Sequence, residues 1–303
     1  MSDRHSSVVL WILVACGGLL VFGVLVFVLL IYSMKSEQAS DFSFGEDKVA
    51  VVDLTGEIFD STSFVEQLDK YGKDSSIKAI VLHIDSPGGS AAASQEIYSA
   101  INRVRTKNKK IVVASIASVG ASGAYYAACA ADKVYANPSA LTGSIGVILQ
   151  YYSYGDLLKW MKMKDVVVKS GQFKDTGDPA RDLTDAEKEY LQKLIDDTYQ
   201  QFVEAVAKGR KLSVDAVKTV ADGRVFTGRE AKANKLVDEV GDLQDAIDAA
   251  AKMANIKGEP HVIKSTKQKP SLFDLIFGDA SSLIPPPLQR MSKEAPLQYL
   301  WHP

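Results

Sequence analysis

The strongest constraint in this sequence of 303 residues is an uninterrupted apolar run close to the N-terminus. Residues 8–32 form 25 consecutive positions without a charged side chain. Because a helix rises about 1.5 Å per residue, roughly 20 apolar residues cross the hydrocarbon of a bilayer. The run is longer than the core of a cleaved secretion signal, about 7–15 residues, and the sequence that follows it fits a cleavage site poorly. We therefore predict an uncleaved transmembrane helix over 8–32, preceded by a short tail over 1–7.

The residues that flank this run give a weak indication of its orientation. Arg4 precedes the run and Lys35 follows it, so the positive charges that usually mark the cytoplasmic side are nearly balanced. A first span with a very short N-terminal tail commonly leaves the body of the protein on the far side of the membrane. We expect the polar residues 33–47 to act as a linker to that body.

Charge and composition narrow the functions open to the rest of the chain. The 35 Lys and Arg residues are balanced by 37 Asp and Glu residues, which argues against binding to nucleic-acid phosphates. The two cysteines, Cys16 and Cys129, exclude a disulfide framework and a multi-cysteine zinc site. No two of the four histidines lie at ligand spacing. The sequence therefore predicts neither a metal nor a cofactor.

Residues 48–258 alternate between short β-rich runs and amphipathic stretches, and form the predicted domain. We expect strands at 49–54, 79–84, 111–116, 133–136, 147–150 and 166–169. The helices expected between them are 64–71, 92–104, 122–131 and 156–163. Strands of continuous Val and Ile separated by helices are typical of a largely parallel sheet that is covered on both faces. We predict an α/β fold, followed by a flexible C-terminal tail over 259–303.

Helix-start signals dominate the second half of the domain. A capping box formed by Thr184 and Glu187 precedes a long helix to about residue 208, and Thr227 and Glu230 form another ahead of residues 231–236. Further helices are expected over 214–220 and 242–253. The tail carries an apolar patch at 271–277 and three prolines at 285–287. Three roles for it stay open: an arm that reaches a neighbour's groove, a site of self-cleavage, and an unused tail.

Three segments depart from the pattern of an ordinary core. The first is DSPGGS at 85–90, at the carboxyl end of a predicted strand, where the ligand crevices of parallel sheets lie. Gly88 and Gly89 let the backbone turn its N–H groups outward with no Cβ in the way, as an oxyanion hole requires. An isolated PGG sequence more often marks a plain strand-to-helix turn.

The second segment is SVGASGAYY at 118–126, directly after a predicted strand. Ser122 lies among small residues, which would let a substrate backbone approach closely. The first amides of the following helix would favour developing negative charge. A serine that merely caps the helix is the alternative. The pattern makes Ser122 a candidate nucleophile.

The third segment, KSGQFKDTGD at 169–178, supplies Lys174. A catalytic serine needs a base, but His83, the only histidine of the domain before residue 261, is expected in mid-strand, so a Ser–His–Asp triad is poorly supported. A buried lysine with a lowered pKa can accept the proton instead, although most lysines are solvated surface charges. Phe173 would help by excluding water. Asp175 would stabilise the charged ammonium unless it points to the other side of the chain.

Together these segments resemble a known family. DSPGG, ASVGASGAYYAA, NPSALTGSIGV at 137–147 and KSGQFKD occur in the order found in SppA-type signal peptide peptidases of the short, single-domain form. The resemblance extends over most of 48–250 and does not cover the tail. It implies a ClpP/crotonase-like fold of repeated ββα units in two stacked sheets. It also implies a membrane-anchored protein that assembles into homo-oligomers.

The same resemblance implies roles for individual residues. Ser122 becomes the nucleophile, Lys174 the general base, and Ser144 the residue whose hydroxyl helps to orient the lysine amine. Gly89, beside Gly88, joins the backbone donors of the oxyanion hole. The implied activity is that of a serine endopeptidase with a Ser–Lys dyad that degrades cleaved signal peptides and similar apolar peptides. The implied location is the bacterial cytoplasmic (inner) membrane, with a single span and the catalytic domain on the extracytoplasmic side.

Two other functions stay open at this point. A crotonase-like acyl-CoA hydratase or isomerase would share the fold. Such an enzyme needs paired carboxylates near the glycine-rich amides, and no such pair follows the PGG turn. A non-enzymatic, membrane-tethered scaffold would make Ser122 and Lys174 incidental.

Overall fold

Strand β4 (Ile111–Ala121) lies at the centre of an eight-stranded sheet in the computed structural model, which describes residues 47–264 and 297–301. The sheet runs in the order β7-β6-β4-β2-β1-β9, with β5 beside β4 and β8 beside β5. The pairing of β6 with β7 is antiparallel and the other pairs of this sheet are parallel. Its other strands are β1 (Lys48–Thr55), β2 (Ile77–Ser86), β5 (Lys133–Ala136), β6 (Leu141–Gly143), β7 (Val225–Thr227), β8 (Glu239–Val240) and β9 (His261–Lys264).

Strand β4 pairs with two strands, β5 and β6, along the same edge. Its residues Val113–Ile116 pair with β5, whereas its last residues, Val119–Ala121, pair with β6. A separate two-stranded sheet joins β3 (Gly88–Ser90) to β10 (Gln298–Leu300). The carboxyl end of β4 is thereby held between β2 and β6, and it leads directly into residue 122.

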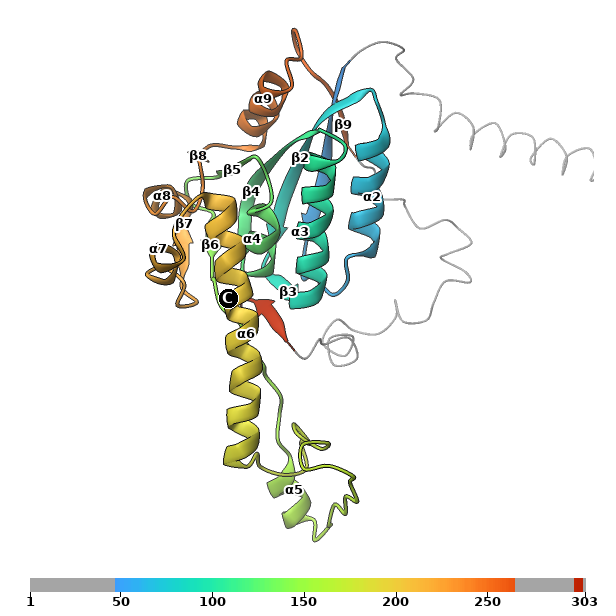
Figure 1. Ribbon diagram of the computed structural model, residues 1–303, viewed down its shortest axis with the longest axis vertical. Helices are drawn as coiled ribbons and strands as arrows, with labels where there is room; N and C mark the ends of the chain where they lie inside the picture. The colour runs from blue at the N-terminus through green and yellow to red at the C-terminus, as the bar shows by residue number, and fades with distance from the viewer. Residues whose placement is uncertain (1–46, 265–296, 302–303) are drawn as a thin grey trace, which may run out of the picture. The chain divides into compact units, whose positions relative to one another are not determined.

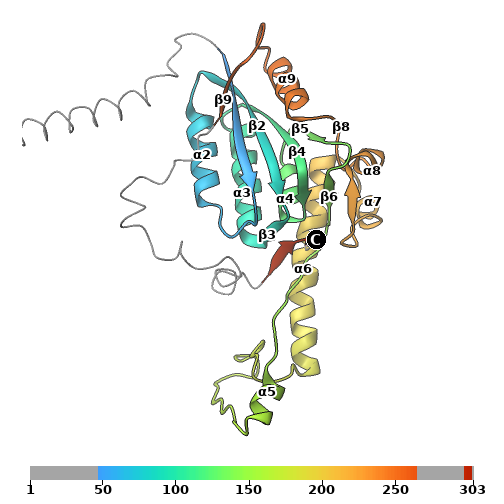
Figure 2. The ribbon, with the colours of Figure 1, turned by 180° about the vertical axis from the view of Figure 1, so that it is seen from behind.

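Helices cover both faces of the main sheet. On one face α2 (Thr62–Lys73), α3 (Ala91–Thr106) and α4 (Gly123–Ala128) build the larger apolar core with the C-terminal half of α6 (Asp185–Arg210). On the other face α9 (Leu243–Met253) buries a smaller core against β1, β2 and β4. Figures 1 and 2 show α2 and α3 on the opposite side of the sheet from α9. The spacing of the buried residues of α3, among them Ile97, Ile101 and Val104, is that of an amphipathic helix.

Helix α6 is longer than the sheet it packs on. It begins with a capping box between Thr184 and Glu187, and its buried residues are concentrated between Thr198 and Ala207. The N-terminal half extends past the sheet, where α5 (Gly155–Trp160) and its flanking segments lie beside it (Figure 1). Two short helices, α7 (Val214–Lys218) and α8 (Gly228–Ala233), follow α6.

Most of the predicted elements are confirmed, and two strands are wrong. The helix predicted at 122–131 is present as α4 but is shorter. The helices predicted at 184–208 and 242–253 correspond to α6 and α9. At 147–150 only Ile148 forms a bridge, to Gln298. Residues 166–169 form no strand, although their composition favours one, because no strand among the described residues lies beside them. Their valines are exposed instead.

The predicted flexible tail, residues 259–303, is corrected at two places. Strand β9 adds to the edge of the main sheet beside β1, and β10 pairs with β3. Both segments are short, and β10 lies far along the chain from its partner, so local patterns could not indicate either pairing. The predicted apolar patch at 271–277 and the prolines at 285–287 lie outside the described residues.

The predicted transmembrane helix at 8–32 also lies outside the described residues, as does most of the predicted linker. Within residues 47–264 and 297–301, no helix combines the length and the apolar character that crossing a bilayer requires. Helix α6 has the length, with 26 residues, but carries charged side chains along much of its surface.

Candidate active site

Ser122 lies at the junction between β4 and α4, in a backbone conformation that serine rarely adopts. Its φ angle is +53° and its ψ angle −117°. The amide of Ser122 donates to the carbonyl of Gly143 at 2.8 Å, and its own carbonyl accepts from the amide of Tyr126 at 2.8 Å. Strained residues at sharp strand-to-helix turns are characteristic of nucleophiles that must project from a sheet. The residue is 1% exposed, so only a partner that enters the site can reach it.

Ser144 lies on the neighbouring strand end, at the position that corresponds to Ser122. The register of β4 and β6 opposes Ala121 and Gly143, the residues just before the two serines. Ser144 also has a positive φ, +49°, and is 6% exposed. Its amide donates to the carbonyl of Arg224 at 2.9 Å. The fold thus brings together two of the serines singled out in the sequence, Ser122 and Ser144.

Gly88 and Gly89 lie next to this pair and form the start of β3. Gly88 has a φ of +95°, and a Cβ built on it would lie 2.6 Å from the amide nitrogen of Gly123. No other residue type fits there, because the backbones of β3 and of the first turn of α4 approach too closely. The amide of Gly123, the first residue of α4, is a candidate oxyanion donor that the sequence predicted only in general, among the first amides of the helix after Ser122.

Strand β10 lies beside these glycines, between β3 and Ile148. It runs antiparallel to β3, with Tyr299 opposite Gly89. The amide of Trp301 donates to the carbonyl of Pro87 at 2.9 Å, and the amide of Ala91 donates to the carbonyl of Leu297 at 3.2 Å. On its other edge β10 is bound to Ile148: each of Ile148 and Gln298 donates its amide to the carbonyl of the other, at 3.0 and 3.1 Å. An extended segment of the chain therefore lies between two backbone walls.

The carbonyl oxygen of Tyr299 is directed at the glycine cluster. A Cβ on Gly88 would lie 2.1 Å from this oxygen, and a Cβ on Gly123 would lie 3.0 Å from it. The Tyr299 carbonyl thus occupies the space between Gly88 and the first residue of α4, next to Ser122.

The side chain of Tyr299 fills a buried aromatic pocket. It is fully buried, and its ring stacks on Tyr126 with centroids 5.2 Å apart and packs against Phe202 at 4.7 Å. Its hydroxyl donates to the carbonyl of Thr198 at 3.0 Å. Burial raises the pKa of Tyr126 to about 12, so its hydroxyl stays protonated. Such a pocket suits a large apolar or aromatic side chain.

Cys129, at the C-terminal end of α4, does not compete with Ser122 as a nucleophile. Its side chain is buried, and burial raises the pKa of the thiol to about 12. A thiol in this environment stays protonated and inert at neutral pH. The hydroxyls of Ser122 and Ser144 remain as the candidate nucleophiles at this end of the sheet.

Lys174 lies in a different part of the fold. Its turn is attached to the start of α6, where the hydroxyl of Thr176 donates to Glu187 at 3.3 Å. On the site side, the ring of Tyr126 packs on Phe202 with centroids 5.1 Å apart. The helix between Glu187 and Phe202 is roughly 22 Å long, more than a lysine side chain can span. One chain in this conformation does not bring Lys174 to Ser122, in keeping with the position of α5 and its neighbours in Figure 2.

The amine of Lys174 is also without a fixed partner. The residue is exposed, and among the described residues its Nζ forms no hydrogen bond or ion pair; only its amide is bonded, to the carbonyl of Gly171 at 3.1 Å. The burial that the sequence reasoning required of this lysine is absent in the single chain.

His83 lies where the sequence predicted it, in mid-strand. Its Nδ1 lies 2.9 Å from Oδ1 of Asp53 on β1, and on β4 it is opposite Ser115. Strand β4 continues for roughly 20 Å from Ser115 to Ser122, at about 3.3 Å per residue. His83 and Asp53 are therefore too far from Ser122 to act as a triad with it.

Profiles of two known peptidase families match the sequence of this chain. The profile of peptidase family S49 matches residues 104–257, and that of the Clp protease family matches residues 36–142. The second match, together with the parallel-rich α/β sheet, is consistent with the predicted ClpP-like fold. The S49 match covers Ser122, Ser144 and Lys174.

Similar proteins occur in archaea and bacteria. A protein of Methanocaldococcus jannaschii, provisionally named a protease, is 34% identical over 265 residues, covering 82% of this chain and 84% of its own length. One of Synechocystis, named in the same way, is 39% identical over 235 residues, 77% of this chain and 84% of its own. A protein of Enterococcus faecium, provisionally named signal peptide peptidase SppA, is 36% identical over 196 residues, 65% of this chain and 57% of its own.

Proposed function

The chain belongs to peptidase family S49, and on that premise we propose that it is a serine endopeptidase with Ser122 as nucleophile and Lys174 as general base. The observation that carries the proposal is the position of β10. An extended segment enters the groove with one carbonyl beside Gly88 and Ser122 and one side chain in an aromatic pocket. Recognition of a peptide by added strand pairing uses backbone bonds for affinity and such pockets for specificity.

The chemistry of the proposed reaction follows from the groups around Ser122. The hydroxyl oxygen attacks the carbonyl carbon of a bound peptide and gives its proton to the neutral amine of Lys174, which the hydroxyl of Ser144 helps to orient. In this proposal the backbone N–H groups of Gly89 and Gly123 stabilise the oxyanion, whereas the amide of Gly88, also expected as a donor, donates to Oγ of Ser86 at 3.2 Å. The amine then protonates the leaving nitrogen, and water hydrolyses the acyl-enzyme. Loss of one oxyanion donor typically lowers kcat about 10²–10³-fold.

The base comes from a second copy of the chain. This step is supported by the separation of Lys174 and Ser122 within one chain, which the Lys174 of a neighbouring molecule would close. The proposed active unit is therefore a homo-oligomer, in which the segment around residue 174 of one chain enters the site of the next. An amine that is solvated in the single chain becomes buried in such an interface, and burial lowers the pKa of a lysine.

Exposed apolar side chains on the same segment support an interface there. Trp160 is 80% exposed, Val166 81% and Val168 97%, and the segment 161–174 contains no buried residue. Several large apolar side chains exposed on one segment usually mark a protein or membrane contact. The three valines at 166–168 also have the composition of a strand and no partner strand among the described residues, as a segment that pairs only on assembly would.

The substrates are extended, apolar peptides, because the groove binds a strand and the pocket takes a large uncharged side chain. Signal peptides left in the membrane after secretion meet both requirements. The apolar run at 8–32 would hold the enzyme at the membrane surface where such peptides collect and so raise their effective concentration. In this proposal the catalytic domain lies on the extracytoplasmic side of the bacterial inner membrane.

The test is hydrolysis of an apolar reporter peptide by the full chain in detergent. Ser122→Ala and Lys174→Met should each lower kcat by at least about 10³-fold, with an unchanged melting temperature. Ser118→Ala and Lys188→Met are the matched controls, since both replace an exposed residue of the same type away from the reacting groups. Near-normal turnover in Ser122→Ala would overturn the assignment of the nucleophile, and near-normal turnover in Lys174→Met that of the base.

A further inference from the structure

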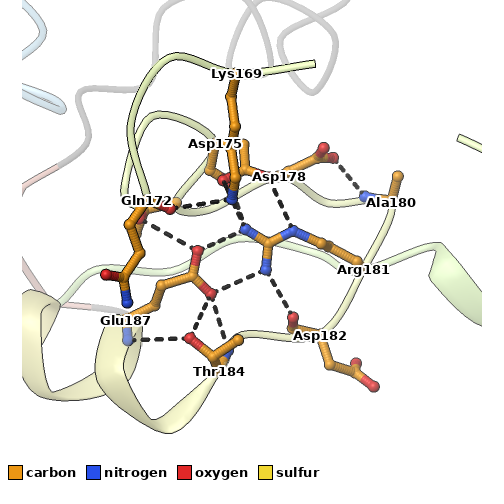
Figure 3. A network of polar contacts seen from close by, with 10 residues as sticks. Lys169, Gln172, Asp175, Asp178, Ala180, Arg181, Asp182, Thr184 and Glu187 are labelled. Atoms are coloured by element: carbon orange, nitrogen blue, oxygen red, sulfur yellow. Dashed lines mark hydrogen bonds and ion pairs between the residues drawn. The ribbon is translucent and has the colours of Figure 1, made fainter. Parts of the chain in front are cut away.

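Four charged side chains form a closed cluster at the turn that carries Lys174 (Figure 3). The amine of Lys169 lies 2.5 Å from Oδ1 of Asp175, and the guanidinium of Arg181 lies 3.0 Å from the same oxygen. Arg181 also pairs with Glu187 through two parallel bonds, Nη1 to Oε2 at 2.9 Å and Nη2 to Oε1 at 2.5 Å. Two cations and two anions are thus joined into a neutral unit.

Glu187 ties this cluster to the first turn of α6. Its side chain is 3% exposed and accepts from the amide of Thr184 at 2.9 Å, from the hydroxyl of Thr184 at 3.0 Å and from the hydroxyl of Thr176 at 3.3 Å. The pairing with Arg181 holds the pKa of Glu187 well below its usual range, so the carboxylate stays ionised. The turn that contains Lys174 is thereby fixed to a rigid helix.

Asp175 is the acidic group closest in sequence to Lys174, and both of its carboxylate oxygens are occupied. Oδ1 accepts from Lys169, and Oδ2 accepts from Nε of Arg181 at 3.2 Å. The carboxylate is only 11% exposed. Lys169, and then Arg181, hold the pKa of Asp175 below its ordinary value, so it remains negative at neutral pH.

The other charged groups of this segment do not pair with Lys174 either. Oδ1 of Asp178 accepts from the amide of Ala180 at 2.8 Å, and the carboxylate of Asp185 pairs with Lys188 at 3.4 Å. Within the described part of the chain, the remaining charged residues between 160 and 187 have exposed side chains and form no ion pair with Lys174: Lys162, Lys164, Asp165 and Asp182. Asp175 is therefore the anion that would compete for this amine if it were released.

Resting on the proposed role of Lys174 as base, we infer that Lys169, Asp175, Arg181 and Glu187 form a positioning device. The device fixes the Lys174 turn to α6 and keeps the Asp175 carboxylate away from the Lys174 amine. A carboxylate within about 4–6 Å would stabilise the ammonium form and so remove the base from use at neutral pH. Lys169 and Arg181 act here as positioning residues, because neither touches the reacting atoms.

The test compares the pH dependence of kcat/KM for full-length variants on an apolar reporter peptide. Lys169→Met removes one of the two cations that contact Oδ1 of Asp175 and leaves the contacts of Arg181 with Asp175 and Glu187 intact, so the fold should survive; the melting temperature checks this. The acidic limb, the part of the profile where kcat/KM falls at low pH, should move up by about one pH unit. At a given pH on that limb, activity should therefore be about tenfold lower. Lys169→Met combined with Asp175→Asn should return the limb to its wild-type position, because the competing anion is gone.

Lys188→Met is the matched control and should leave the limb in place, since it removes a lysine whose partner is Asp185. An unshifted limb in Lys169→Met, or a double variant as impaired as the single one, would overturn the inference. Both results are read alongside Lys174→Met. An inactive Lys174→Met with an unshifted Lys169→Met removes only the positioning role, whereas an active Lys174→Met removes the proposed base itself.

Discussion

A Cβ atom on Gly88 would lie 2.1 Å from the carbonyl oxygen of Tyr299. The two residues meet because β10, near the C-terminus, pairs with β3, and the contact lies beside Ser122. A methyl group on Gly88 would therefore collide with backbone atoms of both β10 and the first turn of α4.

Gly88→Ala should lower kcat at least about 10²-fold, because the added methyl group fills the space required by the oxyanion. Gly258→Ala is the control: its φ of +80° carries a similar backbone penalty to the +95° of Gly88, but nothing lies within 4 Å of the added atom. Steady-state kinetics of both variants would check this. Equal losses in the two variants would show that backbone strain, not the lost space, is responsible.

Tyr299→Ala should lower KM for an apolar peptide about tenfold while kcat changes little. The C-terminal strand is a tethered competitor for the groove, and tethering gives it a high effective concentration. Trp301→Ala, on the same strand but outside the aromatic pocket, should have a smaller effect. Initial rates over a range of peptide concentrations would decide, and a KM that rises in Tyr299→Ala would mark β10 as a structural wall of the site.

Mixing two inactive variants should restore activity if the dyad forms between chains. Ser122→Ala supplies an intact Lys174, and Lys174→Met supplies an intact Ser122. After dissociation and random reassembly, about one quarter of the interfaces would combine the two intact residues. The measurement is the turnover of the mixture relative to wild type at equal total protein. A mixture that stays inactive under conditions where wild-type protein regains activity would contradict a shared site.

Stability should depend on the ion pair between Arg210 and Asp238. Nη2 of Arg210 lies 2.8 Å from Oδ1 of Asp238, and the arginine side chain is 6% exposed. Burial alone would raise the pKa of Asp238, but the hydrogen bond and charge of Arg210 outweigh it and leave the pKa lowered. The stabilisation is therefore present above the unfolded pKa, about 4, and is lost as pH falls through the lower folded value.

Arg210→Met should accordingly lower the free energy of unfolding by about 2 kcal/mol at pH 7. The difference from wild type should shrink towards pH 3, where protonation of Asp238 begins to remove the charge that needs a partner. Urea denaturation at the two pH values would measure it. A difference independent of pH would assign the loss to packing of the arginine stem.

The sequence predicted the order of strands and helices well where the signals are local. The Val- and Ile-rich runs of β1, β2 and β4 need only their own composition, and the capping boxes at Thr184 and Thr227 are formed by residues three positions apart. The proximity of Ser122 and Ser144 follows from the resemblance that singled them out, and the register of β4 and β6 provides its geometry.

What the sequence could not predict depends on partners distant along the chain or absent from it. Strand β10 has three residues, and its position depends on Gly89 and Ile148, far from it in sequence. The run at 166–169 has the composition of a strand, but strand composition does not guarantee a neighbour to pair with. Lys174 is exposed because its segment extends away from the rest of the fold and cannot bury its own side chains.

The backbone at residue 122 restricts which nucleophiles this enzyme could ever acquire. A φ of +53° is especially costly for a residue branched at Cβ, so threonine would strain the turn even though it carries the same hydroxyl. Cysteine has the unbranched shape of serine and fits without that cost. Laboratory evolution that seeks another reactive group at this turn should therefore arrive at a thiol before a secondary alcohol.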